Sequence, residues 1–130
     1  MMRRRLLNIE DEKINLAENA TYTGWYGIDY SNGNIKAGNP YRYTSYIDIS
    51  GCNKIKYSRL YATYSSNTMG IAFYDDTQTY ISGINSVYNQ ATSSFILTET
   101  SVPQNAKYIR LTACRQGNLA GVPLEVYKVN

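Results

Sequence analysis

The chain has 130 residues, the length of a single domain, because two independent cores in so short a chain would each be too small to be stable. It contains no histidine, the usual general base and the most common metal ligand, so we expect neither typical hydrolase chemistry nor a zinc site. A net charge of +3 with 18% charged residues is too weak for a nucleic-acid footprint over the whole chain.

The composition and the start of the chain bound the remaining possibilities. Fourteen tyrosines against two phenylalanines and one tryptophan are the compositional feature to explain. Cys52 and Cys114 stand in separate segments without a CxxC pattern, and the sequence leaves open whether they are bridged. No apolar run approaches the roughly 20 residues that a membrane-spanning helix needs. The first residues also lack the apolar stretch of a signal peptide, so we expect neither membrane insertion nor export.

Residues 1–20 differ from the rest of the chain and predict an N-terminal docking arm. They contain no aromatic residue, and their four basic and four acidic side chains cancel. So short a segment is marginal as an isolated helix in water and needs a partner surface to become ordered. The arginines have the chemistry to bind phosphate, but the acidic residues that follow favour a solvated or protein-docked arm. The anchoring residues expected in this arm are Arg3, Arg4, Arg5, Leu6, Leu7 and Ile9.

Residues 21–130 carry only β signals and predict one antiparallel β-sandwich domain. Short segments rich in Ile, Val, Tyr and Thr recur at intervals of roughly ten residues between Gly, Asn, Ser and Pro clusters. About eight strands of this kind suit a jelly-roll-like sandwich. The predicted strands are Thr21–Tyr30, Tyr43–Ser50, Lys54–Tyr64, Met69–Tyr74, Thr79–Ser82, Ser94–Thr98, Lys107–Cys114 and Leu124–Val129.

Turn residues and alternation give the connections and the faces of these strands. Turns are predicted at 31–34, 38–40, 50–51, 75–76, 101–103 and 116–118. A bulge near Ser58 and Arg59 would reconcile the mixed alternation of the third strand. Alternate residues point to opposite faces of a strand. The predicted core side chains are Ile47, Ile49, Ile71, Phe73, Ile109, Leu111, Ala113, Leu124 and Val126, and those expected on the opposite faces are Tyr46, Asp48, Tyr74, Tyr108, Arg110 and Tyr127.

Four segments together resemble a recurring sandwich module. These are YIDISG at 46–51, IAFYDD at 71–76, YISG at 80–83 and VPQNAKYIRL at 102–111. They are similar to galactose-binding-like jelly rolls of tailed-phage virion proteins and of gut-bacterial surface proteins, over about residues 40 to 129. The basic opening MMRRRLL also looks like the start of small virion proteins of gut phages. The resemblance implies a β-sandwich that binds or decorates, and it assigns no ligand residues in this chain.

The first half of the domain holds the candidate contact residues. Aromatic side chains cluster there between Tyr22 and Tyr46, interleaved with asparagines. Such a cluster would stack on a sugar ring while amides bond its hydroxyls, and the same composition serves a protein contact. Tyrosine is also simply a good strand residue, so cross-strand pairing without any ligand stays open. The candidate residues are Trp25, Tyr26, Tyr30, Tyr41 and Tyr43.

Catalytic and metal chemistry find little support in the sequence. A glycosidase needs two convergent carboxylates, whereas the domain carries scattered single acids and one adjacent pair, Asp75 and Asp76, which are typical turn residues. Two adjacent carboxylates in a turn seldom hold Ca²⁺, which takes six to eight oxygen ligands. A cysteine nucleophile without histidine lacks its usual base. We therefore expect no enzyme, no metal and no cofactor.

These observations together favour a virion structural protein of a tailed phage. It would decorate the capsid or belong to a head fibre or the tail, be assembled in the host cytoplasm, and attach to other virion proteins through its arm. A homo-oligomer or a place in a larger assembly is expected. The alternative is a carbohydrate-binding module for host adhesion or polysaccharide recognition, and one chain could combine the two roles through an adhesive face.

Overall fold

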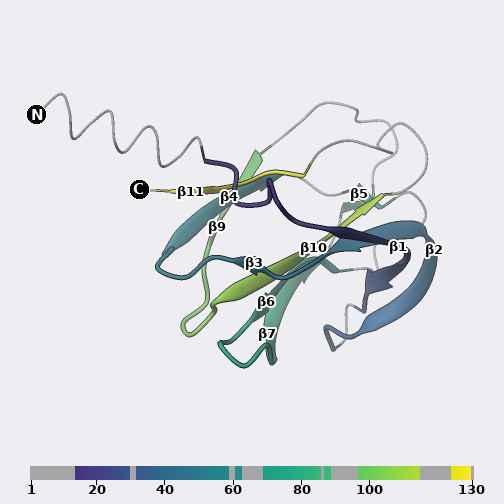
Figure 1. The fold of residues 1–130 in the computed structure, drawn as a ribbon, viewed down its shortest axis with the longest axis horizontal. Coiled ribbons are helices and arrows are strands. Elements are labelled where there is room, and N and C mark those ends of the chain that lie inside the picture. Colours follow the sequence, from purple (N-terminus) through teal and green to yellow (C-terminus); the bar gives the residue numbers. More distant parts are fainter. Residues whose placement is uncertain are drawn as a thin grey trace, which may run out of the picture.

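The protein is an all-β structure with two main antiparallel sheets packed together and a separate two-stranded pair (Figure 1). The computed structural model describes residues 14–29, 32–58, 61–62, 69–85, 87–88, 97–114 and 124–129. These residues contain no helix, and accordingly none that is long and apolar enough to cross a membrane. The strands are β1 (Tyr22–Ile28), β2 (Ile35–Thr44), β3 (Ile47–Asp48), β4 (Lys54–Ser58), β5 (Tyr61–Ala62), β6 (Met69–Tyr74), β7 (Tyr80–Asn85), β8 (Val87–Tyr88), β9 (Leu97–Ser101), β10 (Tyr108–Cys114) and β11 (Val126–Lys128).

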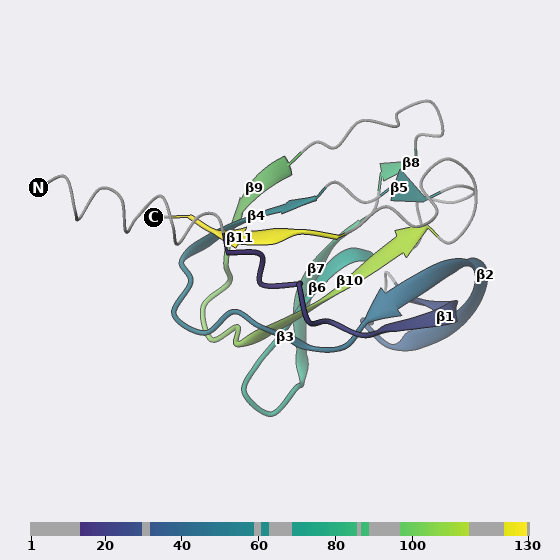
Figure 2. The ribbon, with the colours of Figure 1, turned by 45° about the horizontal axis from the view of Figure 1, so that its top comes forward.

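The larger sheet has the strand order β1-β2-β10-β6-β7, and β3 also pairs with β10. The smaller sheet has the order β11-β4-β9, while β5 and β8 form a short parallel pair. Figure 2 shows β9, β4 and β11 lying together above the strands of the larger sheet, with the β1–β2 hairpin extending to one side. The expectation of a β-sandwich is therefore confirmed.

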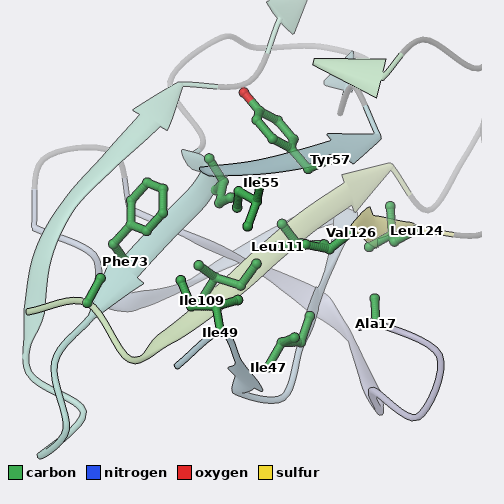
Figure 3. Close-up of a cluster of buried hydrophobic side chains, with 12 residues drawn as sticks. Ala17, Ile47, Ile49, Ile55, Tyr57, Phe73, Ile109, Leu111, Leu124 and Val126 are labelled. Atoms are coloured by element: carbon green, nitrogen blue, oxygen red, sulfur yellow. The ribbon is translucent and has the colours of Figure 1, made fainter. Parts of the chain in front are cut away.

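The main core fills the space between the two sheets. Side chains of Ile55, Leu111 and Val126 point toward one another there (Figure 3). Alternation predicted the inward positions of Leu111 and Val126, because every second residue of a strand points to the same face, whereas the mixed alternation around Ile55 left it unassigned. The buried members are Ala17, Ile47, Ile49, Ile55, Tyr57, Ile71, Phe73, Ala106, Ile109, Leu111, Leu124 and Val126. All predicted core residues with described side chains are thus confirmed; the side chain of Ala113 lies outside the described part.

Residues 14–20, the end of the predicted arm, pack against the domain. Ala17 is a buried member of the main core. The Leu16 amide donates to the Val126 carbonyl at 2.8 Å, and the Val126 amide donates to Asn15 Oδ1 at 3.0 Å. Asn15 Nδ2 also donates to the Leu124 carbonyl at 3.3 Å. This segment therefore covers the outer edge of β11, which would otherwise present unpaired backbone groups.

The turn predicted at residues 38–40 is wrong, because these residues lie inside β2. These turn-favouring residues lie instead at an irregularity in the pairing of β1 with β2. Gly24 pairs with Arg42 but Tyr26 pairs with Ala37, so several extra β2 residues stand opposite a single β1 residue. A strand tolerates Gly and Pro at such a bulge, where ladder hydrogen bonds are already interrupted.

Two other predicted strands are divided. The segment predicted as Tyr43–Ser50 is the end of β2 followed by β3, with a break at Ser45 and Tyr46. At the break the Thr44 hydroxyl replaces a ladder carbonyl and accepts from the Leu111 amide at 3.0 Å. The segment predicted as Lys54–Tyr64 contains β4 and β5, and the bulge predicted at its centre falls partly on Arg59, outside the described residues.

Candidate binding site

The face of the larger sheet turned away from the main core carries a second cluster. We call it the tyrosine cluster and define it as Tyr43, Tyr46, Tyr74, Tyr80, Tyr108 and Arg110. Its rings pack against the buried side chains of Ile28 and Ala72. Tyr74 is 2% exposed, whereas the other members are only partly buried. Tyr74 therefore lies on the face opposite the main core, as predicted, but the turn at Gly33 covers it there.

Strand register brings the tyrosines together. Tyr108 in β10 pairs with Tyr74 in β6, which in turn pairs with Tyr80 in β7. Tyr46 reaches this row from the break between β2 and β3, with its ring centroid 5.1 Å from Tyr74 and 6.0 Å from Tyr108. All three contacts, including Tyr74 with Tyr80 at 6.0 Å, are edge-to-face. Such pairs each contribute about 0.5–1.5 kcal/mol beyond their buried area.

Arg110 lies inside this arrangement. Its guanidinium carbon is 4.3 Å from the ring centroid of Tyr46, 4.7 Å from that of Tyr74 and 5.7 Å from that of Tyr43. A guanidinium over aromatic faces is attracted by the ring quadrupole. Ala72 stands opposite Arg110 in the ladder, so no bulky neighbour in β6 competes for the space. The arginine is therefore held from three sides by aromatic rings.

The β1–β2 turn closes over one end of the cluster. Gly33 has a φ of 73°, and a Cβ at this position would lie 2.3 Å from the Tyr80 ring, so only glycine fits. The Tyr74 hydroxyl donates to the Gly33 carbonyl at 3.2 Å. Burial raises the pKa of Tyr74 above its ordinary value, although the charge and hydrogen bond of Arg110 oppose this. The phenol therefore stays protonated and keeps its donor for the Gly33 carbonyl.

The structure describes the side chains of only some of the predicted contact residues. Tyr26 lies on β1 and is 42% exposed. Tyr43 belongs to the tyrosine cluster and is partly buried there. The backbones of Trp25 and Tyr41 lie in β1 and β2, but their side chains, like the whole of Tyr30, lie outside what the structure describes. The predicted anchoring residues Arg3, Arg4, Arg5, Leu6, Leu7 and Ile9 also lie outside the described residues.

Besides Arg110, four members of the cluster were not among the predicted contact residues: Tyr46, Tyr74, Tyr80 and Tyr108. The available signal was alternation, which puts Tyr108 and Arg110 on one face of β10 and Tyr74 on the noncore face of β6. What alternation does not supply is the pairing of β6 with both β10 and β7. The cluster can therefore be recognised only once the strand order is known.

The acidic side chains and Cys52 are further candidates for a site among the described residues. They contain no group of three or more Cys, Asp or Glu side chains placed to hold a metal ion. The Asp75 carboxylate is occupied by its own turn: it accepts from the Thr77 amide at 2.9 Å, the Thr77 hydroxyl at 2.7 Å and the Thr79 amide at 2.9 Å. Cys52 is a free thiol whose pKa is raised by burial, so it is neither bridged nor activated.

An open hollow of about 550 Å³ lies at the end of the smaller sheet, lined by Lys54, Glu99 and Lys128 among others. Its mixed charges select no single ligand class.

Comparisons with family models, curated proteins and solved structures find no match to this chain. The assignment of function therefore depends on the chain's own residues, and the likeness to phage and gut-bacterial sandwich modules stays a prediction.

Proposed function

We propose that the protein is a non-enzymatic structural component of a tailed-phage particle, attached to other virion proteins by the segment before Ile14. The observation that carries the proposal is how that segment joins the fold. Asn15 and Leu16 bond to the edge of β11, and Ala17 is buried in the main core. An arm that continues from these residues is fixed to the sandwich at its base.

The composition of the segment before Ile14 supports an attachment role. After two methionines it carries three arginines and then Leu6, Leu7 and Ile9, and it then turns acidic, a pattern with little capacity to fold alone and with both charge and apolar surface for a partner. The resemblance of the sandwich to phage modules supplies the setting, with capsid decoration, head fibre and tail as the alternatives.

Deletion of residues 1–13 tests attachment without damaging the fold, because Asn15, Leu16 and Ala17 are retained. We expect the truncated protein to unfold at the same temperature as the full chain and to be missing from purified particles. A second variant with Arg3, Arg4 and Arg5 all changed to Lys keeps the charge and controls for it. Incorporation of the truncated protein at the level of the full chain would contradict the proposal.

A second candidate function, glycan recognition, is favoured by exposed aromatic surface on β1. Tyr22 and Tyr26 are 40% and 42% exposed, and Arg42 lies 4.5 Å from the Tyr22 ring centroid. Exposed aromatic faces are the usual stacking surface for sugar rings. A glycan array with the wild type, Trp25→Ala and Tyr26→Ala tests this role. Binding that both variants lose would support it, and an array without signal would remove it.

A further inference from the structure

The turn between β1 and β2 contains the one Asn-Gly pair of the sequence, Asn32 and Gly33. In such a pair the backbone nitrogen of the glycine can attack the side-chain amide carbon of the asparagine, because glycine has no side chain to block the approach. The Gly33 nitrogen loses its proton and bonds to Asn32 Cγ, and the amide nitrogen takes up a proton and leaves as ammonia. Water then opens the cyclic imide at either carbonyl, which gives aspartate or isoaspartate. The pair is therefore a candidate site of deamidation, a spontaneous modification that needs only water.

Solvent reaches the asparagine but not the glycine. The Asn32 side chain is exposed, whereas Gly33 is buried beneath the turn. Water and hydroxide can therefore contact the amide that would be lost. The attacking nitrogen, in contrast, belongs to the covered residue, so the rate of the reaction depends on how often the turn opens.

Hydrogen bonds of the folded turn oppose the attack. The Gly33 amide donates to the Asp29 carbonyl at 2.9 Å, so the nitrogen that would attack is already bonded through its proton. Asn32 Oδ1 accepts from the Asn34 amide at 2.9 Å, and this bond keeps the side chain in the rotamer of the folded turn. Ring closure requires the Gly33 proton to be released and the Asn32 side chain to rotate. The folded turn therefore slows the modification that its sequence favours.

The tyrosine cluster holds this turn closed. The Tyr74 hydroxyl donates to the Gly33 carbonyl at 3.2 Å, and the Tyr80 ring lies so near that a Cβ on Gly33 would be 2.3 Å from it. Isoaspartate would add a methylene group to the backbone next to Gly33, where no space is left for a shift toward Tyr80.

We propose that Asn32 is a deamidation site controlled by the tyrosine cluster. The closed turn protects Asn32, opening of the turn allows the reaction, and an isoaspartate formed there prevents full closure. This inference is independent of attachment to a particle, because the turn and the cluster both belong to the isolated chain.

Incubation of the full chain at neutral pH, in buffer and in urea, tests the proposal. Peptide mass spectrometry follows the replacement of the amide group by a hydroxyl at Asn32, and labelling by an isoaspartate methyltransferase detects the isoaspartate. We expect the half-time at Asn32 to be at least about tenfold longer in buffer than in urea, because the two hydrogen bonds of the turn must break first. Asn34 is the internal control, since the β-branched Ile35 follows it, and it should stay unmodified over the same period.

Two variants separate the turn from the intrinsic chemistry. Tyr74→Phe removes the donor to the Gly33 carbonyl and keeps the ring, so deamidation of Asn32 in buffer should be about fivefold faster. Tyr26→Phe removes a hydroxyl from an exposed side chain of β1 and should leave the rate unchanged. In urea the wild type and both variants should react at the same rate, because no turn is left to protect Asn32.

Each result decides one part of the proposal. Equal half-times in buffer and in urea would overturn protection by the fold. Equal rates for Tyr74→Phe and Tyr26→Phe in buffer would overturn control by the tyrosine cluster. An unmodified Asn32 in urea would overturn the site itself. Isoaspartate-containing protein, separated by chromatography, should unfold at a lower temperature than the unmodified chain, and an unchanged unfolding temperature would overturn the effect on closure.

Discussion

The two faces of the larger sheet have different chemical surroundings, although neighbouring residues of the same strands form them. On one face Ile109 and Leu111 are completely buried against the smaller sheet, among aliphatic side chains. On the other, Tyr108 and Arg110 stand among tyrosines with their polar ends retained. Adjacent residues of one strand thus belong to a dry core and to a layer that holds a charge. Five of the fourteen tyrosines belong to this second layer, where a hydroxyl or an aromatic face meets a polar partner.

The largest expected effect comes from the dry face. Leu111→Ala should lower the free energy of unfolding by about 2–5 kcal/mol, because it removes transfer energy and leaves a cavity in the main core. Chemical denaturation measures the change, with the exposed Glu99→Ala as a control expected to stay within about 0.5 kcal/mol. A Leu111→Ala protein as stable as the control would show that the main core does not hold the sheets together.

The next largest loss of stability is expected where the turn between β1 and β2 packs against the tyrosine cluster. Gly33→Ala should cost about 2 kcal/mol, because alanine is strained at a φ of 73° and its Cβ would collide with the Tyr80 ring. Gly51 has a similar φ of 80°, but a Cβ added there would have nothing within 4 Å, so Gly51→Ala isolates the backbone strain. If the two variants were equally destabilised in thermal unfolding, the contact between the turn and Tyr80 would have no energetic weight.

A smaller loss of stability is expected when the hydroxyl of Tyr74 is removed. Tyr74→Phe should cost about 1 kcal/mol, since the buried Gly33 carbonyl loses its donor while the ring contacts remain. Tyr26→Phe, on an exposed side chain, should leave stability unchanged. A Tyr74→Phe protein that is more stable than the wild type would mean that the tyrosine face behaves as a second dry core.

The smallest effect is expected at acid pH and involves neither face. Hydrogen bonds from Ser50 lower the pKa of Asp48 from its ordinary 3.8, and those from Thr79 and Thr77 lower the pKa of Asp75. A depressed pKa stabilises the fold above the unfolded value, and that contribution is lost as pH falls from about 4 through the folded-state values. Changing both residues to Asn should flatten the unfolding free energy between pH 4 and pH 2. An unaltered acid slope would contradict the assignment.

Local sequence patterns predicted which side chains form the dry face. For the other face they predicted which residues point there but not how those residues come together. Alternation is a property of single strands, so Ile71, Phe73, Ile109 and Leu111 could be assigned inward from their own neighbours. The tyrosine cluster depends on which strands pair and on a turn that folds back onto Tyr80, and neither is encoded locally. The GNP segment at 38–40 misled for a related reason: the residues that make a turn also make a bulge, and only the partner strand distinguishes the two.

The difference between the two faces is tested most directly by comparing the free energies of unfolding of Ile109→Ala and Arg110→Gln in one set of denaturation curves. The two residues are adjacent in β10 and point to opposite faces. We predict a loss of about 2–5 kcal/mol for Ile109→Ala. For Arg110→Gln we predict a loss of only about 1 kcal/mol, the weight of partly exposed cation–π contacts. Equal losses would contradict the account, because they would make Arg110 as important to the packing of the fold as a residue of the main core.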